Sequence, residues 1–216
     1  DAMLATGLCS VNTWGYSRRW KRSYDMLTLA LHNDDVVMAR WLYKQHGARW
    51  PNPKYWNYEG VVLYKAIRDA RPASVLFLLE HKMDPNYHAL QPCSPLTVAI
   101  SHRSLASAVL LLQHKADVNT QPFTTLRVSL GQQDTLAMVL RAKIDVDAVD
   151  KDTGNTALHS LFTGRSLLLI LPLVQQLLEA KADPHIRNKK GALPVRMMRH
   201  YKKSKIKREL RQLLAQ

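Results

Sequence analysis

Four related segments of the chain carry the clearest information about its fold. The most regular of them is Leu111-Leu112-Gln113-His114-Lys115-Ala116-Asp117-Val118-Asn119. In each copy a pair of aliphatic residues leads into a lysine and, two positions later, an aspartate. The copies occupy residues 78–86, 111–119, 139–147 and 177–185. Four copies in one register indicate an internal repeat.

A second landmark lies upstream of each copy. Its leucines are spaced 33, 30 and 32 residues apart, at Leu63, Leu96, Leu126 and Leu158. The residues that precede them are typical of helix starts. The hydroxyl of Ser94 or Thr156 can cap a helix, and Pro95 stands where a missing N–H costs little.

The apolar pattern between the two landmarks predicts two short helices in each repeat. In the repeat that begins near Ser94, the inner helix has a stripe of Leu96, Ala99 and Ile100. The outer helix has a stripe made of Leu105, Ala108, Val109, Leu111 and Leu112. One helix pair cannot bury both of its faces, so we expect each pair to stack against its neighbours.

The period near 33 residues, the helix start Thr156-Ala157-Leu158-His159 and the ending Ala116-Asp117-Val118-Asn119 resemble the ankyrin repeat family. The resemblance implies an all-α, ankyrin-type helix-turn-helix solenoid with short β-turn fingers. It covers residues 24–186 as repeats one to five and residues 187–216 as a divergent C-terminal capping repeat with a basic helix. Residues 1–23 are left as an N-terminal aromatic and basic segment, either a cap or the end of an upstream region.

The repeats depart from the family pattern in two ways. Lysine stands where the family usually has glycine, directly after the outer helix, at Lys82, Lys115, Lys143 and Lys181. A left-handed conformation costs a residue with a side chain about 1 kcal/mol, so we expect either mild strain or a different local geometry there. Repeat five is longer than its neighbours and contains Gly164 and Pro172. This predicts a lengthened connection or a bent outer helix near residues 163–172.

Length and composition place the chain among globular proteins. It has 216 residues, of which 46% are hydrophobic, enough for a sizeable core. Only two cysteines occur, Cys9 and Cys93, which favours an intracellular, reducing compartment, cytoplasm or nucleus. No apolar run approaches the ~20 residues that a bilayer span requires. The chain begins at Asp1 without a leader sequence, and we interpret it as part of a longer protein.

Positive charge is concentrated at the ends of the chain. The net charge is +14, yet residues 25–186 hold 16 Lys or Arg against 15 Asp or Glu. Residues 187–216 hold 11 Lys or Arg against Glu209 alone. A balanced middle makes nucleic acid or an anionic membrane surface a secondary partner. The C-terminal basic run consists of Lys202, Lys203, Lys205, Lys207 and Arg208. It has two interpretations, a nuclear-import signal or the solvated face of a capping helix.

The motifs of common enzyme classes do not occur in the sequence. We therefore predict no catalytic activity in this fragment, no cofactor and no metal. His159 matches the family histidine that can hydrogen-bond near a helix start, and Cys93 is interpreted as structural although a helix N-terminus could activate its thiol. Four aspartates alternate along one turn: Asp145, Asp147, Asp150 and Asp152. Because the segment lacks the glycine and the glutamate of a calcium-binding loop, we interpret them as solvated turn residues.

Partner-binding candidates come from two positions in the repeat. Ankyrin-like proteins bind mainly through finger tips and exposed positions of the inner helices. The finger candidates are Tyr55, Trp56, Tyr58, Tyr87 and Phe123. The inner-helix candidates are Lys65, Arg68 and His102. All five tryptophans fall within the first 56 residues, where they either pack an N-terminal cap or contribute to an interface.

The sequence therefore predicts a monomeric, non-catalytic module that binds another protein. A first alternative is binding of a polyanion through the basic ends of the chain. A second is the targeting arm of an enzyme whose catalytic domain lies upstream. A bacterial effector that works inside a host cell is compatible with these predictions.

Overall fold

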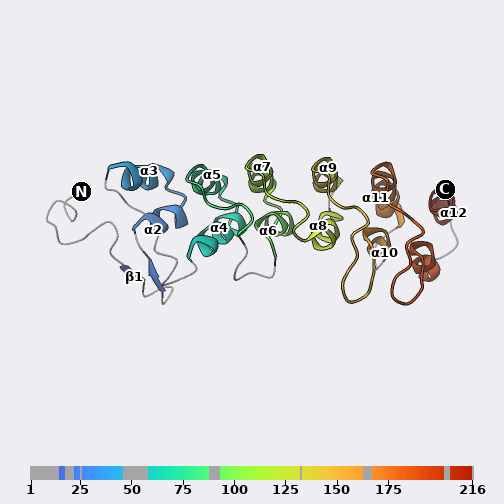
Figure 1. Cartoon of the computed structure of the whole chain (residues 1–216). Helices are drawn as coiled ribbons and strands as arrows, with labels where there is room; N and C mark the ends of the chain where they lie inside the picture. Colours follow the sequence, from blue (N-terminus) through green and yellow to red (C-terminus); the bar gives the residue numbers. More distant parts are fainter. Residues whose placement is uncertain are drawn as a thin grey trace. The chain divides into compact units, whose positions relative to one another are not determined.

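The computed structural model describes residues 15–17, 22–24, 26–45, 58–87, 93–131, 133–162, 167–201 and 205–215. The chain divides into two compact units, Asp1–Ala116 and Asp117–Gln216. Each unit is built from pairs of short antiparallel helices that follow one another along the chain (Figure 1). The division falls between the third and fourth predicted repeats.

Unit 1 contains three helix pairs arranged in two layers. The inner helices contact one another in chain order, and so do the outer helices (Figure 1). The inner layer consists of α2 (Met26–His32), α4 (Tyr58–Arg68) and α6 (Pro95–Ser101). The outer layer consists of α3 (Val36–Gln45), α5 (Pro72–Glu80) and α7 (Leu105–Gln113). Neighbouring pairs thus bury one another's apolar faces, as predicted.

Unit 2 repeats the same arrangement and ends in a divergent pair. Its inner layer consists of α8 (Pro122–Ser129), α10 (Ala157–Leu161) and the 3-10 helix η1 (Pro194–His200). Its outer layer consists of α9 (Gln133–Arg141), α11 (Leu167–Glu179) and α12 (Lys205–Leu213). Contacts run from α8 to α10 to η1 and from α9 to α11 to α12. The all-α helical-repeat fold class is thereby confirmed.

A small β-ribbon precedes the first helix pair. Strands β1 (Gly15–Ser17) and β2 (Arg22–Tyr24) pair in antiparallel fashion, with Tyr16 opposite Ser23. The ribbon lies in the segment that the sequence assigns to an aromatic and basic cap or to an upstream region. No strand was expected there.

The third helix pair tests the predicted apolar stripes. Leu96, Ala99 and Ile100 of α6 are buried, which confirms the inner stripe. On α7 the prediction is wrong for Leu105 and Val109, which are exposed. The buried positions of α7 include Ser107, Ala108 and Leu111. These lie three and four residues apart and define the inward face, whereas Leu105 and Val109 share a different face of the helix.

Each outer helix from the second repeat to the fifth is followed, two residues after its end, by a lysine in the left-handed conformation. The φ angles are 66° at Lys82, 66° at Lys115, 61° at Lys143 and 67° at Lys181. After α5, the N–H of Lys82 donates to Leu79 O at 3.1 Å and the N–H of Met83 donates to Leu78 O at 3.1 Å. These two bonds form a Schellman motif, which satisfies the last helical carbonyls. Of the two expectations for these lysines, the strained left-handed geometry is correct.

The additional residues of repeat five lengthen its outer helix. Helix α11 has 13 residues with Pro172 inside it, whereas α9 has nine. Proline cannot donate the hydrogen bond to the preceding turn. The apolar side chains of Ile170, Val174 and Leu177 are nevertheless buried, so α11 keeps an inward face.

The turns of unit 2 are tied to one another by side chains. The Oδ1 of Asn119 accepts a hydrogen bond from the N–H of Asp145 at 2.7 Å. One repeat later, Oδ1 of Asp147 accepts from the N–H of Asp183 at 2.8 Å. These links give successive turns of the unit a common register.

Candidate functional site

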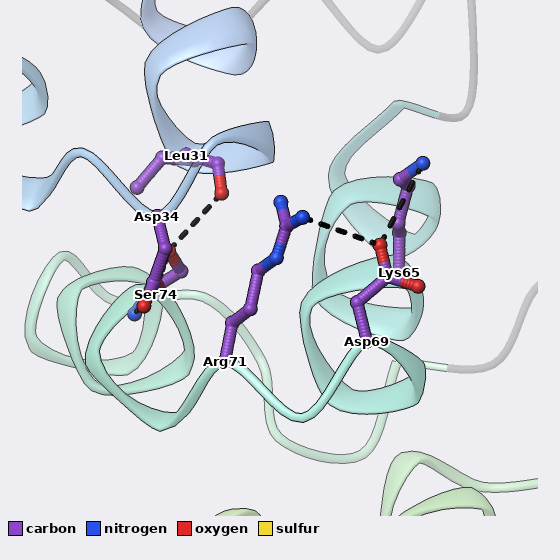
Figure 2. Close-up of polar contacts among 6 residues, drawn as sticks. All are labelled: Leu31, Asp34, Lys65, Asp69, Arg71 and Ser74. Atoms are coloured by element: carbon purple, nitrogen blue, oxygen red, sulfur yellow. Dashed lines mark hydrogen bonds and ion pairs between the residues drawn. The ribbon is translucent and has the colours of Figure 1, made fainter.

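A cluster of charged side chains lies in unit 1 where α2 and α4 end and α5 begins (Figure 2). We call it the basic cluster and define it as His32, Lys65, Asp69 and Arg71. Lys65 Nζ lies 3.7 Å from Asp69 Oδ2, and Arg71 Nη2 lies 3.9 Å from the same oxygen. One carboxylate is therefore shared by two cations at distances longer than those of a charge-assisted hydrogen bond, which are about 2.7–2.9 Å.

The guanidinium of Arg71 has hydrogen-bonding capacity that the fold does not use. Its Nη1 atom is shielded from solvent, and no described residue accepts a hydrogen bond from it. A guanidinium carries five N–H donors, and a buried donor without an acceptor costs about 1–3 kcal/mol. The ion pair with Asp69 is thus a weak restraint on a side chain that would gain from a better acceptor.

His32 lies in the positive field of the same cluster. Burial first, and then the charges of Lys65 and Arg71, lower the pKa of His32 to about 4, whereas Asp69 opposes them. The imidazole is consequently neutral at physiological pH. Its pKa is sensitive to any charge that enters the cluster.

The start of α5 is fixed from the preceding repeat. Asp34, in the turn between α2 and α3, has a left-handed φ of 60°. Its Oδ1 accepts from the backbone N–H of Ser74 at 3.2 Å and lies 2.6 Å from the Ser74 hydroxyl, which also lies 3.1 Å from Leu31 O (Figure 2). Because Arg71 provides no side-chain cap, Asp34 supplies the carboxylate that the helix N-terminus favours.

The structure places three predicted inner-helix residues in unit 1. Lys65 is half-buried on α4 within the basic cluster, and Arg68 is exposed at the last position of α4. His102 is exposed directly after α6. Because α4 and α6 contact each other, Arg68 and His102 lie at corresponding ends of neighbouring helices. Their part in binding stays a prediction.

The predicted finger residues fall in several environments. Tyr55 and Trp56 lie outside the described residues. Tyr58 is the first residue of α4 and Phe123 is the second residue of α8, so both belong to helices rather than to turns. The sequence reasoning placed both helix starts too late. For α8 the reason is that Pro122 can occupy the first helical turn. Tyr87 lies in the turn after α5 and is half-buried.

A buried tyrosine holds the two sides of this turn together. The hydroxyl of Tyr64, on α4, lies 2.5 Å from Cys93 O and 3.2 Å from Tyr87 O. Burial raises the pKa of Tyr64 well above its ordinary value, so the hydroxyl remains a donor. Tyr87 and Cys93, which flank residues 88–92, are thus linked through the Tyr64 hydroxyl.

Sequence reasoning missed His32, Asp34 and Arg71. His32 precedes Arg68 by 36 positions, the same spacing as that between the left-handed residues Asp34 and Ala70, so His32 and Arg68 occupy equivalent places in adjacent repeats. The 33-residue spacing read from the later repeats does not align them. No comparable signal marks Arg71, because its position depends on the geometry of the turn between α4 and α5.

The histidine of repeat five has a different environment. His159 is fully buried, and its Nδ1 accepts a hydrogen bond from the N–H of Thr156 at 3.2 Å and lies 2.9 Å from the Thr156 hydroxyl. Its Nε2 lies 2.9 Å from Ala192 O and donates to it in this tautomer. Burial lowers the pKa of His159, and the hydrogen bond to Ala192 partly offsets the effect. The predicted structural role near a helix start is confirmed.

Two turns of unit 2 pack tightly beside this histidine. The N–H of Lys189 donates to Thr153 O at 3.0 Å, and the Asn188 amide donates to Asn155 Oδ1 at 2.8 Å. Gly154 has a φ of 71°, and a Cβ at this position would lie 2.8 Å from the backbone nitrogen of Lys189. Only glycine permits this approach without displacement of the backbone.

The aspartates of the turns bind backbone N–H groups. Asp145 Oδ1 accepts from the N–H of Asp147 at 3.1 Å, and Asp150 Oδ1 accepts from the N–H of Thr153 at 2.8 Å. Hydrogen bonds from the side chain and backbone of Thr153 lower the pKa of Asp150. Within the described part of the chain, no group of three or more His, Cys, Asp or Glu side chains could hold a metal ion.

The C-terminal basic run is only partly accessible. Lys202 and Lys203 lie outside the described residues, and Lys205 and Arg208 are exposed on α12. Lys207 differs from the prediction, because it is 7% exposed and its Nζ donates to Tyr201 O. It lies on the same buried side as Leu210 of α12 and Leu214 just after the helix, three and seven residues later, so it does not contribute to a solvated basic face.

The helices were also compared with the requirements for membrane insertion. Among the described residues, none of the helices has both the length and the apolar character needed to cross a bilayer.

The fold defines an all-α protein made of repeated helix pairs. No protein-family model matches the chain. A crystal structure of an ankyrin repeat domain from Acinetobacter baumannii AYE is similar to it, with a TM-score of 0.70 and 25% sequence identity. The match covers 88% of this chain and 95% of that one. The chain is an ankyrin-repeat-like protein. The ankyrin repeat fold is typically non-catalytic.

Proposed function

We propose that this chain is a non-catalytic module that binds another protein through the exposed ends of its inner helices and the adjoining turns. The observation that carries the proposal is the placement of Arg68 and His102. They are exposed at corresponding ends of α4 and α6, while Leu63 and Ile67 of α4 and Leu96 and Ile100 of α6 are buried. Arginine on a preassembled surface is a common anchor of protein interfaces.

Affinity capture from a eukaryotic lysate tests this function. The intact chain is compared with a variant that carries Arg68→Ala and His102→Ala, and with the finger variant Trp56→Ala/Tyr58→Ala. The matched control carries Lys44→Ala and Arg141→Ala, two exposed positions on outer helices. We expect proteins that the intact chain and the control both retain and that the Arg68/His102 variant loses. Identical protein lists from this variant and the control would contradict the proposed surface.

Polyanion binding is a second candidate, supported by the cations that unit 2 exposes. These include Arg187, Lys189, Lys190, Lys205 and Arg208. If this surface binds nucleic acid or an acidic membrane, its affinity should fall steeply with salt concentration, because cations are released from the polyanion's counterion atmosphere. A partner protein held by few charges would show a smaller dependence.

We also propose that the chain is monomeric and acts in the cytoplasm or nucleus, inside a host cell if it is a bacterial effector. Sedimentation equilibrium and a fluorescent fusion test these two points. A dimer at micromolar concentration would contradict the first.

A further inference from the structure

We propose that the last repeat of unit 2 binds the phosphate backbone of a nucleic-acid duplex, without base specificity. The cations that this repeat exposes form what we call the C-terminal basic surface: Arg187, Lys189, Lys190, Arg196, Lys205, Arg208 and Arg211. They lie in the connection between α11 and η1, on η1 and on α12 (Figure 1). The inference goes beyond the proposed protein surface, which lies in unit 1. It rests on the second candidate function, for which it names the partner.

The cations of this surface outnumber the carboxylates near them. Residues 187–216 hold 11 Lys or Arg against Glu209 alone. Residues 117–186, the rest of unit 2, are slightly acidic, with six Lys or Arg against eight Asp or Glu. Even when every carboxylate of the unit is counted, 17 Lys or Arg remain against nine Asp or Glu. A positive excess of this size, gathered in one repeat, attracts a dense polyanion.

The fold does not neutralise these cations. Within the described part of the chain, no ion pair involves any member of the C-terminal basic surface. Arg187 Nη1 donates to Gly191 O at 3.0 Å, and Lys189 Nζ donates to Lys151 O. Both acceptors are uncharged carbonyls, so the two side chains are positioned while their charges remain available.

Helix α12 carries the strongest part of the surface. The aspartates of the adjoining turn, among them Asp150 and Asp152, reduce the positive field near Lys189, whose backbone N–H donates to Thr153 O. On α12 only Glu209 has this effect. Its three exposed cations, Lys205, Arg208 and Arg211, are three residues apart and lie on one side of the helix. At 1.5 Å per residue the row is about 9 Å long, which matches about three successive phosphates of one duplex strand.

The shortage of aromatic side chains favours a duplex over a single strand. Proteins that bind single strands stack the bases on exposed aromatic rings. Tyr201 is the only Phe, Trp or Tyr among residues 187–216. It is half-buried, and its hydroxyl donates to Phe162 O at 3.2 Å. The surface therefore offers charge for a backbone and no stacking platform for bases, and contacts to phosphates alone carry no sequence information.

The apolar residues of α12 argue against a lipid surface. Basic helices that bind membranes insert an apolar face about 5–10 Å into the lipid. Leu210 of α12 and Leu214 just after it are buried within unit 2. The large apolar side chains that the described part of unit 2 exposes, Val149 and Leu169, belong to repeat five. An acidic membrane would thus be held by charge alone, so a nucleic-acid duplex fits the surface better.

The experiment measures binding of the full chain to a fluorescein-labelled DNA duplex of mixed sequence. Fluorescence anisotropy gives the affinity at several salt concentrations. Four neutralised phosphates predict that binding weakens about 150-fold between 50 mM and 200 mM salt, because counterions are released from the duplex. Duplexes rich in A·T and in G·C should bind within about twofold of each other, since the bases are not read.

One triple variant and a matched control locate the surface. Lys205→Gln/Arg208→Gln/Arg211→Gln removes three exposed cations of α12, and we expect binding at low salt to weaken about tenfold or more and the salt slope to fall by about two to three units. The control Arg141→Gln/Lys143→Gln/Lys151→Gln removes the same charge from exposed positions elsewhere in unit 2 and should change the affinity less than about threefold. Equal effects of the two variants would overturn the proposed surface.

A gain of affinity separates binding from folding. Glu209→Gln removes the only carboxylate of the repeat, and we expect the duplex to bind about two- to threefold more tightly, which unfolding cannot produce. Weaker binding by this variant would contradict the proposal. Tighter binding of a single strand, of polyglutamate or of phosphatidylserine vesicles at equal salt would also overturn it.

The result can be told apart from that of the proposed protein surface. Treating the lysate with nuclease before capture removes proteins that nucleic acid bridges to the chain. If capture then depends on Arg68 and His102 while the duplex does not bind, only the present inference fails. If the duplex binds as expected while capture is independent of Arg68 and His102, the inner-helix surface fails and the C-terminal basic surface stands.

Discussion

The basic cluster of unit 1 and the His159 site of unit 2 each contain a histidine with a lowered pKa, but the surroundings differ. His159 is fully buried, and each of its ring nitrogens has a hydrogen-bond partner: Thr156 for Nδ1 and Ala192 for Nε2. His32 is half-buried, and two neighbouring cations contribute to its lowered pKa. Burial is the largest cause of the lowered pKa at both sites, and only at His32 do the charges of neighbouring cations add to it.

This difference separates a structural site from a responsive one. A histidine whose bonds are satisfied resists any change in its neighbours, because each change breaks a hydrogen bond. A histidine whose pKa depends partly on neighbouring charges changes its ionisation when those charges change. The predictions that follow test this distinction, beginning with the largest effect.

Replacement of His159 should cost the most. In His159→Leu the N–H of Thr156 loses its partner in a buried region, and the hydroxyl of Thr156 and the carbonyl of Ala192 each lose one of their contacts. We expect unit 2 to lose about 3 kcal/mol of unfolding free energy, measured by urea denaturation. His32→Leu should cost less than half as much, because His32 is only half-buried. Equal losses would remove the distinction between the two sites.

The packing of the two turns beside His159 can be tested with a pair of glycines. Gly154 and Gly191 have φ angles of 71° and 68°. A Cβ added at Gly154 would have neighbours within 4 Å, whereas one added at Gly191 would have none. Gly191→Ala should therefore cost about 1 kcal/mol from backbone strain alone. Gly154→Ala should cost at least about 1 kcal/mol more, since the Cβ would collide with the backbone of Lys189. Thermal unfolding of both variants checks the difference.

Acid should destabilise both units. The folded state lowers the pKa of His32 to about 4 and also lowers that of His159, so the unfolded chain binds protons more readily below pH 6.5. Stability is full above pH 6.5 and falls as the pH drops below it. For His32 we expect a loss of about 1–2 kcal/mol between pH 7 and pH 5, allowing for its partial exposure, and for His159 a loss in the same direction.

Hydrogen exchange resolved by helix can assign this acid effect to each unit. In His32→Leu, the acid-induced increase in exchange should diminish in α2 and α4 and persist in α10. The reverse pattern should appear in His159→Leu. An acid response that is identical in the two variants would show that carboxylates, rather than these histidines, control it.

The smallest effect should be common to both units. Lys115→Gly in unit 1 and Lys143→Gly in unit 2 each relieve a left-handed lysine, with φ angles of 66° and 61°. Each should stabilise the protein by up to about 1 kcal/mol, less the added entropy of glycine in the unfolded chain. Calorimetric melting temperatures measure the gain. Destabilisation by either substitution would mean that the lysine side chain contributes contacts that outweigh the strain.

The repeat pattern made most of the fold predictable. It gave six helix pairs, the caps at Ser94 and Thr156 and the unusual lysines, because all of these depend on local sequence in a fixed register. It failed for Lys207, since charge alone does not reveal which face of a helix a residue occupies.

The candidate site was less predictable. Lys65 and Arg68 follow from their offset within the repeat, whereas Arg71 becomes significant only through an atom that the fold shields from both solvent and acceptors. His32 joins the cluster across a repeat boundary. Contacts of this kind are determined by side-chain geometry between repeats, which a period of 33 residues does not specify.

The Tyr64 hydroxyl has a practical consequence for protein engineering. It lies against the carbonyls of both Tyr87 and Cys93, so the spacing between the ends of the intervening segment is set by a side chain outside that segment. In Tyr64→Phe the carbonyls of Tyr87 and Cys93 would lose this common donor although no residue between them has changed. Engineering on either side of Tyr87 or Cys93 should therefore retain Tyr64.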